Sequence, residues 1–189
     1  LKPEEGWNYE IGYKRINKKD NWKVDVFYMD FKNFFQWQPD ANGRPLVRVN
    51  GGKFRNVGIE AEYGRRLSDR LKWNVSGSYS NPSQKEMNEN YWKQAAPKLQ
   101  FTTGIRYESP TWEAGTSFSF VTKRLRNRDG GLNPNIALWN AYVGYHFNKD
   151  ATLRLDARNL LDRHNVITNG DYEYWGDPFT YELSYTQKF

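Results

Sequence analysis

The sequence predicts an all-β protein, an antiparallel up-and-down transmembrane β-barrel to which this chain contributes about nine strands. Three observations lead to this class. Apolar and polar residues alternate in short segments along the chain, the connections between segments are alternately short and long, and aromatic residues recur at one end of the segments. No segment approaches the ~18 consecutive apolar residues that a transmembrane helix requires.

Each predicted strand has one apolar and one polar face, because successive side chains of a strand point to opposite sides. In the last strand, Tyr181, Leu183, Tyr185 and Phe189 alternate with polar residues, although Gln187 interrupts the apolar series. The predicted strands are residues 7–14, 22–31, 57–64, 71–80, 99–107, 112–120, 139–147, 151–157 and 181–189.

The connections between these strands alternate in length. Short turns are expected around INKKD, RLSDR, SPT and NKD. The long joins are roughly residues 32–56, 81–97, 122–137 and 159–180. Within the first, FFQWQPDANGRPLVRVN is also consistent with a hairpin that lengthens its two strands and turns at DANG, with Phe34, Phe35 and Trp37 near its base. Short turns at one end and long loops at the other are typical of an outer-membrane barrel.

A soluble β-sandwich or lipocalin-like barrel would bury the apolar face, whereas a membrane barrel would turn it to lipid. Hydrophobic residues make up only 38% of the chain and aromatic residues 17%, which is compatible with a barrel because only alternate residues meet lipid. Aromatic residues at the short-turn end of eight strands favour a membrane interface, where their polar tips reach water. They are Tyr13, Trp22, Tyr63, Trp73, Tyr107, Trp112, Phe147 and Phe189.

The opposite face is too charged for a dry core. Its charged residues are Glu60, Glu62, Lys72, Arg106, Arg154, Asp156 and Arg158. We therefore expect residues 1–189 to form the C-terminal portion of a transmembrane barrel domain without a plug. If the short turns are periplasmic, the first strand starts on the extracellular side, so an odd number of strands is expected to precede it, on the same chain or on a companion.

Several stretches resemble the C-terminal part of the barrel of TonB-dependent outer-membrane receptors, particularly the siderophore type. They are LKPEEGWNYEIGYK, VDVFYMDFKN, RVNGGKFRNVGIEAEYG, NLLD at 159–162 and the terminal strand. The end of the chain is similar to the signal that the barrel-assembly machinery recognises, which here comprises Tyr181, Leu183, Tyr185 and Phe189.

The resemblance implies a 22-stranded barrel around an N-terminal plug, located in the bacterial outer membrane. It implies uptake of a scarce ligand, usually a ferric siderophore, powered by TonB through the plug. The partners it implies are the remaining strands and plug, TonB, the assembly machinery, and membrane lipid with lipopolysaccharide. No covalently bound cofactor, no nucleic-acid partner and no enzymatic activity are expected.

No catalytic or metal-binding pattern stands out. His146 and His164 have no Cys, His or carboxylate neighbours at ligand spacing. Glu60 and Glu62 share the polar face, where a polar lumen or ion pairs with a plug explain them better than acid–base catalysis does.

The long loops carry the candidate ligand residues. KRLRNR, which begins at Lys123, places cations where they could steer an anionic ferric chelate, or simply remain solvated or touch lipopolysaccharide phosphates. Aromatic side chains on other loops could stack on a flat ligand or pack loop against loop. The candidates are Tyr91, Trp92, Arg124, Arg126, Arg128, Tyr172, Tyr174 and Trp175.

Two other functions remain open at this point. A passive porin would differ mainly in the part that precedes this chain. A soluble basic protein that binds single-stranded nucleic acid would mix aromatic and basic residues on one face, whereas here they are segregated; the net charge of +6 allows either kind of anionic partner.

Overall fold

A computed structural model describes residues 1–38, 47–126, 131–167 and 172–189. Within these ranges the chain has no helix of the length and apolarity that crossing a bilayer requires. The described strands are β1 (Glu5–Ile16), β2 (Asp20–Gln38), β3 (Val47–Arg66), β4 (Leu71–Ser80), β5 (Ser83–Lys85), β6 (Lys93–Gln94), β7 (Leu99–Glu108), β8 (Trp112–Val121), β9 (Arg124–Leu125), β10 (Leu132–Asn133), β11 (Ile136–His146), β12 (Ala151–Arg158) and β13 (Thr180–Gln187).

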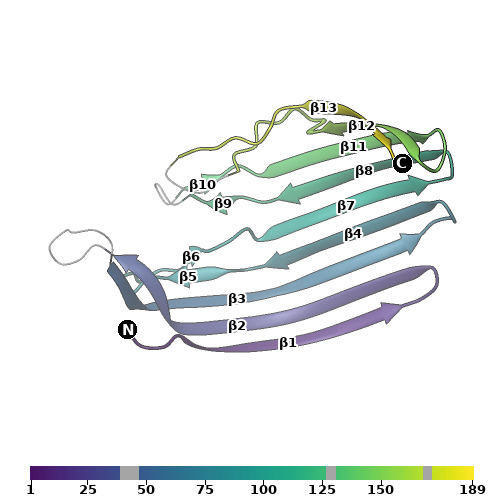
Figure 1. Cartoon of the computed structure of the whole chain (residues 1–189). Helices are drawn as coiled ribbons and strands as arrows, with labels where there is room; N and C mark the ends of the chain where they lie inside the picture. Colours follow the sequence, from purple (N-terminus) through teal and green to yellow (C-terminus); the bar gives the residue numbers. More distant parts are fainter. Residues whose placement is uncertain (39–46, 127–130, 168–171) are drawn as a thin grey trace.

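The long strands form a single antiparallel meander. Its order is β1-β2-β3-β4-β7-β8-β11-β12-β13, so each long strand pairs with the next one along the chain. Figure 1 shows this sheet as one twisted wall. The nine predicted strands are therefore confirmed, although β13 ends at Gln187 rather than at residue 189.

The two ends of the wall differ as the sequence predicted. Tight turns join β1 to β2, β3 to β4, β7 to β8 and β11 to β12 at the end where the C-terminus lies (Figure 1). The turn before β8, for example, is closed by a hydrogen bond from the Ser109 N–H to the Trp112 carbonyl at 2.8 Å. The N-terminus and the long connections lie at the opposite end.

The sheet has almost no dry core. Among the described residues, the buried hydrophobic side chains are Phe27, Ala137, Ala151 and Val166. Large apolar side chains remain exposed instead, including Ile11 at 76% and Leu183 at 65%. We call the face that carries Val57, Ile59 and Tyr63 the outer face, and the opposite one the inner face. A soluble sandwich is excluded by this arrangement, because it would bury the apolar face against a second sheet.

The β2–β3 hairpin extends far beyond the sheet's other strands. The sequence predicted a long join over residues 32–56, with a longer hairpin as the alternative, and the hairpin is correct: the register continues to Gln38 opposite Val47. The turn at DANG lies outside the described residues. A bulge interrupts the register at Asn33, whose φ of 57° is left-handed, a conformation that Asn tolerates better than most residues.

The N-terminal segment is attached to this hairpin. Asn50 accepts a hydrogen bond from the Lys2 N–H and donates one to the Lys2 carbonyl at 2.8 Å. The Phe35 N–H donates to Glu4 Oε1 at 2.8 Å. These bonds hold the start of the chain against the base of the β2–β3 extension.

Two of the predicted long loops contain short strands. β5 continues the sheet beside β3 and is followed on its other side by β6, while β9 and β10 form a separate two-stranded ribbon. The period-two pattern missed them because strands of two or three residues are too short to show alternation.

The predicted aromatic residues do gather at the short-turn end. The Tyr13 and Trp22 rings lie 4.9 Å apart, the Tyr63 and Trp73 rings 5.5 Å apart, and Trp112 lies 4.8 Å from the ring of Tyr145. Each of these contacts joins two neighbouring strands: β1 with β2, β3 with β4, and β8 with β11. Their role as a membrane-interface girdle stays a prediction.

Candidate ligand-binding rim

The long connections are joined to one another at the end of the sheet, and together they form a rim. The Met87 N–H donates to Gln36 Oε1 at 3.1 Å, which links the β5–β6 connection to the β2–β3 hairpin. Gln94 Nε2 donates to the Lys123 carbonyl at 2.8 Å, which links that connection to the segment before β9. The loops are thus a continuous structure that holds exposed side chains in place.

The β5–β6 connection is stabilised by one half-buried cation. Lys93 Nζ lies 2.7 Å from a carboxylate oxygen of Glu86 and 2.7 Å from one of Glu89. Burial alone would lower the pKa of Lys93, but the hydrogen bonds to Glu86 and Glu89 outweigh burial and raise it. The hydrogen bond from Lys93 lowers the pKa of Glu89 in turn.

Tyr91 and Trp92 belong to this connection but differ in surroundings. The Tyr91 side chain is 62% exposed, and its hydroxyl donates to Glu89 Oε1 at 3.1 Å. The Arg55 guanidinium lies over the Trp92 ring, 4.1 Å from its centroid. Tyr91 therefore presents an open ring, whereas one face of Trp92 is already covered by a cation.

The predicted arginines have different environments too. Arg124 in β9 is half-buried and donates to the Val166 carbonyl, and its burial lowers its pKa. Its Nε is buried without a hydrogen-bond partner in the described part of the chain. Arg126 lies 3.9 Å from Glu173 across to the last loop. Arg128 lies outside the described residues. Arg124 thus joins β9 to the last loop more than it faces solvent.

The last loop carries the two most exposed aromatic candidates, Tyr172 and Tyr174. Tyr172 is 76%, Tyr174 63% and Trp175 55% exposed. Trp175 pairs with Val166 as an isolated bridge and meets the His164 ring edge-on at 5.9 Å. The structure therefore brings Arg124, Arg126 and the 172–175 aromatics to one side of the rim, while Tyr91 and Trp92 sit on the β3–β5 side.

Sequence reasoning noted the NLLD element but not what it does. Asn159 is 1% exposed; its side-chain nitrogen donates to the carbonyls of Arg163 at 3.0 Å and Asp177 at 2.9 Å. The Phe179 N–H donates to Asp162 Oδ1 at 2.9 Å. Asn159 and Asp162 both have positive φ, at 51° and 46°. The motif therefore clamps both ends of the last loop; Asn and Asp suit it because they tolerate the left-handed conformation and carry short polar side chains.

The inner face carries a polar wall. Glu60 and Glu62 border a hollow of about 310 Å³ together with hydroxyl groups of β4, β7 and β8. Neither carboxylate has an ion-pair partner in the described ranges. Further along, Arg154 lies 3.0 Å from Glu113, 2.8 Å from Asp156 and 3.8 Å from the Tyr142 ring centroid. This wall can pair with charges that approach from inside.

Both histidine side chains contact neighbouring residues of the chain. His146 Nδ1 lies 2.9 Å from Thr152 Oγ1, and His164 packs against Trp175. Over the residues that the structure describes, no three His, Cys, Asp or Glu side chains are grouped so as to hold a metal ion.

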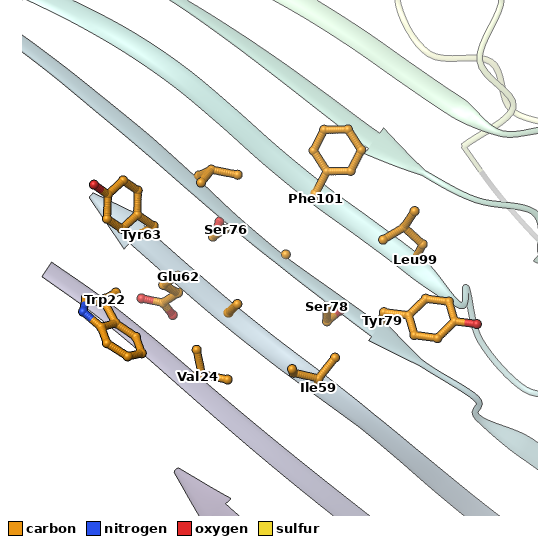
Figure 2. Close-up of a pocket in the computed structure, with 13 residues that line it drawn as sticks. Trp22, Val24, Ile59, Glu62, Tyr63, Ser76, Ser78, Tyr79, Leu99 and Phe101 are labelled. Carbon is orange, nitrogen blue, oxygen red and sulfur yellow. The ribbon is translucent and has the colours of Figure 1, made fainter. Parts of the chain in front are cut away.

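The outer face has an apolar hollow of its own. It has a volume of about 570 Å³ and spans β2, β3, β4 and β7 (Figure 2). Trp22 and Tyr63 lie at its short-turn end, and Tyr79 and Leu99 at its long-loop end. Gly77 allows β7 to approach closely there, because a Cβ at this position would lie 2.8 Å from the Phe101 Cβ.

An open antiparallel wall with an apolar outer face, a charged inner face and a tied loop rim defines a membrane β-barrel wall. The family model described as TonB dependent receptor-like, beta-barrel matches residues 1–160. The chain therefore belongs to the TonB-dependent receptor β-barrel family, whose members reside in the outer membrane of Gram-negative bacteria. The fold class, the resemblance and the localisation predicted from the sequence are confirmed.

Known proteins agree with this assignment. The ferric-pyoverdine M114 receptor PbuA of Pseudomonas sp. (strain M114) is 24% identical over 207 residues, covering 100% of this chain and 25% of that protein. The ferric citrate transporter FecA superposes with a TM-score of 0.80 at 22% identity over 98% of this chain and 32% of FecA. The copper transporter OprC superposes with a TM-score of 0.77 at 17% identity, covering 100% of this chain and 32% of OprC. The chain thus spans about a quarter to a third of the length of these three proteins, which are described as one receptor and two transporters.

Proposed function

We propose that residues 1–189 form the C-terminal portion of the barrel of an outer-membrane active-transport receptor, that its cargo is a ferric siderophore, and that TonB energises uptake. The observation that carries this proposal is the family match over residues 1–160. The exposed aromatic residues of the rim and the partly exposed Arg126 are consistent with it, because such side chains stack on flat ligands and attract anionic chelates.

The proposal assigns separate tasks to the rim and the wall. Tyr172, Tyr174 and Tyr91 offer exposed rings to the cargo, and Arg126 attracts its negative charge. Glu60 and Glu62 on the inner wall accept basic side chains of a plug that fills the barrel. This division follows from their placement, since the rim tyrosines are exposed and neither carboxylate forms an ion pair with a described residue, although Lys23 is the register partner of Glu62.

The same proposal names the structural partners. Every residue of β1 is exposed, and an unpaired strand edge is prohibitively costly in lipid. We propose that further barrel strands pair with β1 and β13. The exposed outer side chains of Tyr181, Leu183, Tyr185 and Phe189 remain the proposed signal for the assembly machinery.

The identity of the cargo is the most specific part of the proposal. The similar proteins are described by ferric-pyoverdine, ferric citrate and copper, so the fold accommodates several metals and chelates. A passive porin has no specific observation in its favour, because the matching family is that of TonB-dependent receptors.

The test uses the complete receptor that contains this chain, expressed in a bacterium that lacks its own siderophore receptors. Uptake of ⁵⁵Fe presented as catecholate, hydroxamate and citrate chelates is measured with and without TonB. We expect uptake of at least one chelate, only when TonB is present. Uptake that is independent of TonB would indicate a passive channel, and saturable uptake of copper without any iron chelate would reassign the cargo.

A further inference from the structure

Three lysines lie side by side on the outer face, at the rim end of the wall. Lys32 of β2 is the register partner of Lys53 of β3, which is in turn the partner of Lys85 of β5. We call these three residues the lysine row. They are on the same face as Val57 and Ile59, because Lys53 precedes both by an even number of positions on β3.

Glu86 and Glu89 line a hollow of about 230 Å³ together with Lys53 and Lys85, but the ion pairs of both carboxylates are with Lys93. None of the three lysines forms an ion pair with a described residue. Glu5 is the register partner of Lys32 at the edge of the sheet. The next outer-face pair toward the short turns is Asp30 of β2 opposite Arg55 of β3. Like charges that face each other across neighbouring strands destabilise a sheet, so an anion that bridges them would stabilise this arrangement.

The lysine row lies at a definite height on the barrel. Trp22 pairs with Tyr63 at the short-turn end, and Lys32 is ten residues further along β2. At ~3.3 Å per residue this is ~33 Å along the strand, and a tilt of about 40° reduces it to ~25 Å of height. An apolar band about 25 Å tall is what an outer-membrane barrel presents to lipid. The row therefore sits where the headgroups of the extracellular leaflet begin.

The change in side chains along the outer face agrees with that height. Tyr28 is opposite Val57, the next outer pair is Asp30 with Arg55, and the next is Lys32 with Lys53. The face thus passes from apolar to mixed to fully cationic within a few residues. Arg55 is held over the Trp92 ring at 4.1 Å, which places an indole beside the cations, as expected at an interface.

The apolar hollow of Figure 2 lies below the lysine row on the same strands. Its long-loop end is at Ile59 and Tyr79, six residues along β3 from Lys53. That separation is ~15 Å in height by the same arithmetic, about half of the bilayer's hydrocarbon core of roughly 30 Å. A lipid with its headgroup on the row can therefore place an acyl chain in the hollow.

We propose that Lys32, Lys53 and Lys85 bind the phosphate groups of a lipopolysaccharide molecule of the extracellular leaflet, with one of its acyl chains in the outer-face hollow. Lysine suits this task because its ammonium group is a compact charge with three donors on a flexible stem. The inference uses the membrane location but not the cargo, so it stands or falls independently of siderophore transport.

Native mass spectrometry of the complete receptor in detergent tests this site with purified lipid A as the probe. Diphosphoryl lipid A is compared with lipid A whose phosphates have been removed. The test variant is K32Q/K53Q/K85Q, and the control is K14Q/K18Q/K19Q, which removes the same charge at the short-turn end. Heat-dependent mobility on gels checks that both variants fold.

The test variant is expected to bind diphosphoryl lipid A about a hundredfold more weakly, since each lysine near an anionic lipid surface contributes roughly 1 kcal/mol. The control should bind as the unaltered receptor does. Equal binding by the test variant, or equal binding of the dephosphorylated lipid, would overturn the proposal. Full displacement by millimolar inorganic phosphate would also overturn it, because the site would then recognise free phosphate rather than a lipid.

Discussion

At the scale of single residues, Asn159 shows how one side chain organises a loop. Its amide is buried and bonds to two carbonyls, while its Oδ1 accepts from the Arg163 N–H at 3.2 Å. A buried polar group of this kind is costly to leave without partners. The last loop, which carries Tyr172 and Tyr174, therefore depends on an asparagine at its foot.

Replacing Asn159 with alanine should open the last loop without unfolding the sheet. The loss of these hydrogen bonds is expected to cost about 2–4 kcal/mol of local stability. Limited proteolysis of the complete receptor should then show new cleavage within residues 160–178. Asn17→Ala is the control, because Asn17 makes one exposed side-chain bond, to Asp20 at 2.8 Å. Equal protection of the loop in both variants would show that Asn159 is not its clamp.

The Lys93 cluster predicts a pH dependence of the β5–β6 connection. The pKa of Glu89 is lowered from its ordinary value of 4.5. The stability that the ionised Glu89 carboxylate contributes is therefore fully present above pH 4.5 and is lost as the pH falls through the pKa of the folded state. The pKa of Lys93 is raised from 10.5, so its contribution is complete below 10.5 and is lost as the pH rises through the folded pKa.

Amide hydrogen exchange of residues 86–92 measures the pH range over which this connection is stable. Protection should be high at pH 7 and fall below pH 4.5, after correction for the intrinsic exchange rate. The Lys93→Met variant should exchange faster at neutral pH and show a smaller pH response. If the variant and the unaltered receptor respond alike, the cluster does not control this connection.

At the scale of elements, the central strands test the assignment of the two faces. In β4, Tyr79 is on the outer face opposite Ile59, whereas Ser78 is on the inner face opposite Glu60. The two positions are adjacent and lie about midway between the short-turn aromatic residues and Lys32, so they differ in side rather than in depth.

An arginine at each position should therefore have different consequences. Tyr79→Arg places a charge in lipid near the middle of the apolar band and should lower the free energy of unfolding by about 2–4 kcal/mol. Ser78→Arg faces the interior beside Glu60 and should change it by less than about 0.5 kcal/mol. Urea unfolding of the complete receptor in lipid vesicles measures both values. A similar loss at both positions would contradict the lipid-facing assignment.

The sequence predicted the long elements and missed the short ones for a physical reason. Alternation over eight or more residues reports a strand and its buried or lipid-facing side. The pairing of β5 with β3, however, is a backbone register between distant segments, such as Phe54 opposite Gln84, which no local pattern encodes. The extension of β2 and β3 was visible as an alternative because NG is a strong turn signal.

At the scale of the whole molecule, the rim brings loops from distant parts of the chain together. Gln94 and Arg124 make the joining contacts. The most exposed rings of the rim, Tyr172 and Tyr174, lie on the loop that Arg124 and Asn159 hold in place. The candidate site is thus a property of several loops and not of one motif.

If these rings stack on the cargo, Tyr172→Ala combined with Tyr174→Ala should weaken binding by about tenfold, since an aromatic contact contributes about 0.5–1.5 kcal/mol. The matched control is Tyr172→Phe with Tyr174→Phe, which keeps both rings and should bind within about twofold. Equilibrium binding of the transported chelate to the complete receptor measures both. Unchanged affinity of the alanine pair would remove these tyrosines from the site.

Sequence alone determined the class of the protein, its nine long strands, the apolar and polar face of each, and the aromatic residues at the short-turn end. These properties are local, because a two-residue period and a turn signal can be read within one segment. The tertiary structure decided which candidates have open surfaces: Trp92 lies beneath Arg55, and Arg124 is bound to Val166. It also aligned the lysine row. Such contacts join residues far apart in the chain, so they depend on strand register and loop packing, which only the folded sheet specifies.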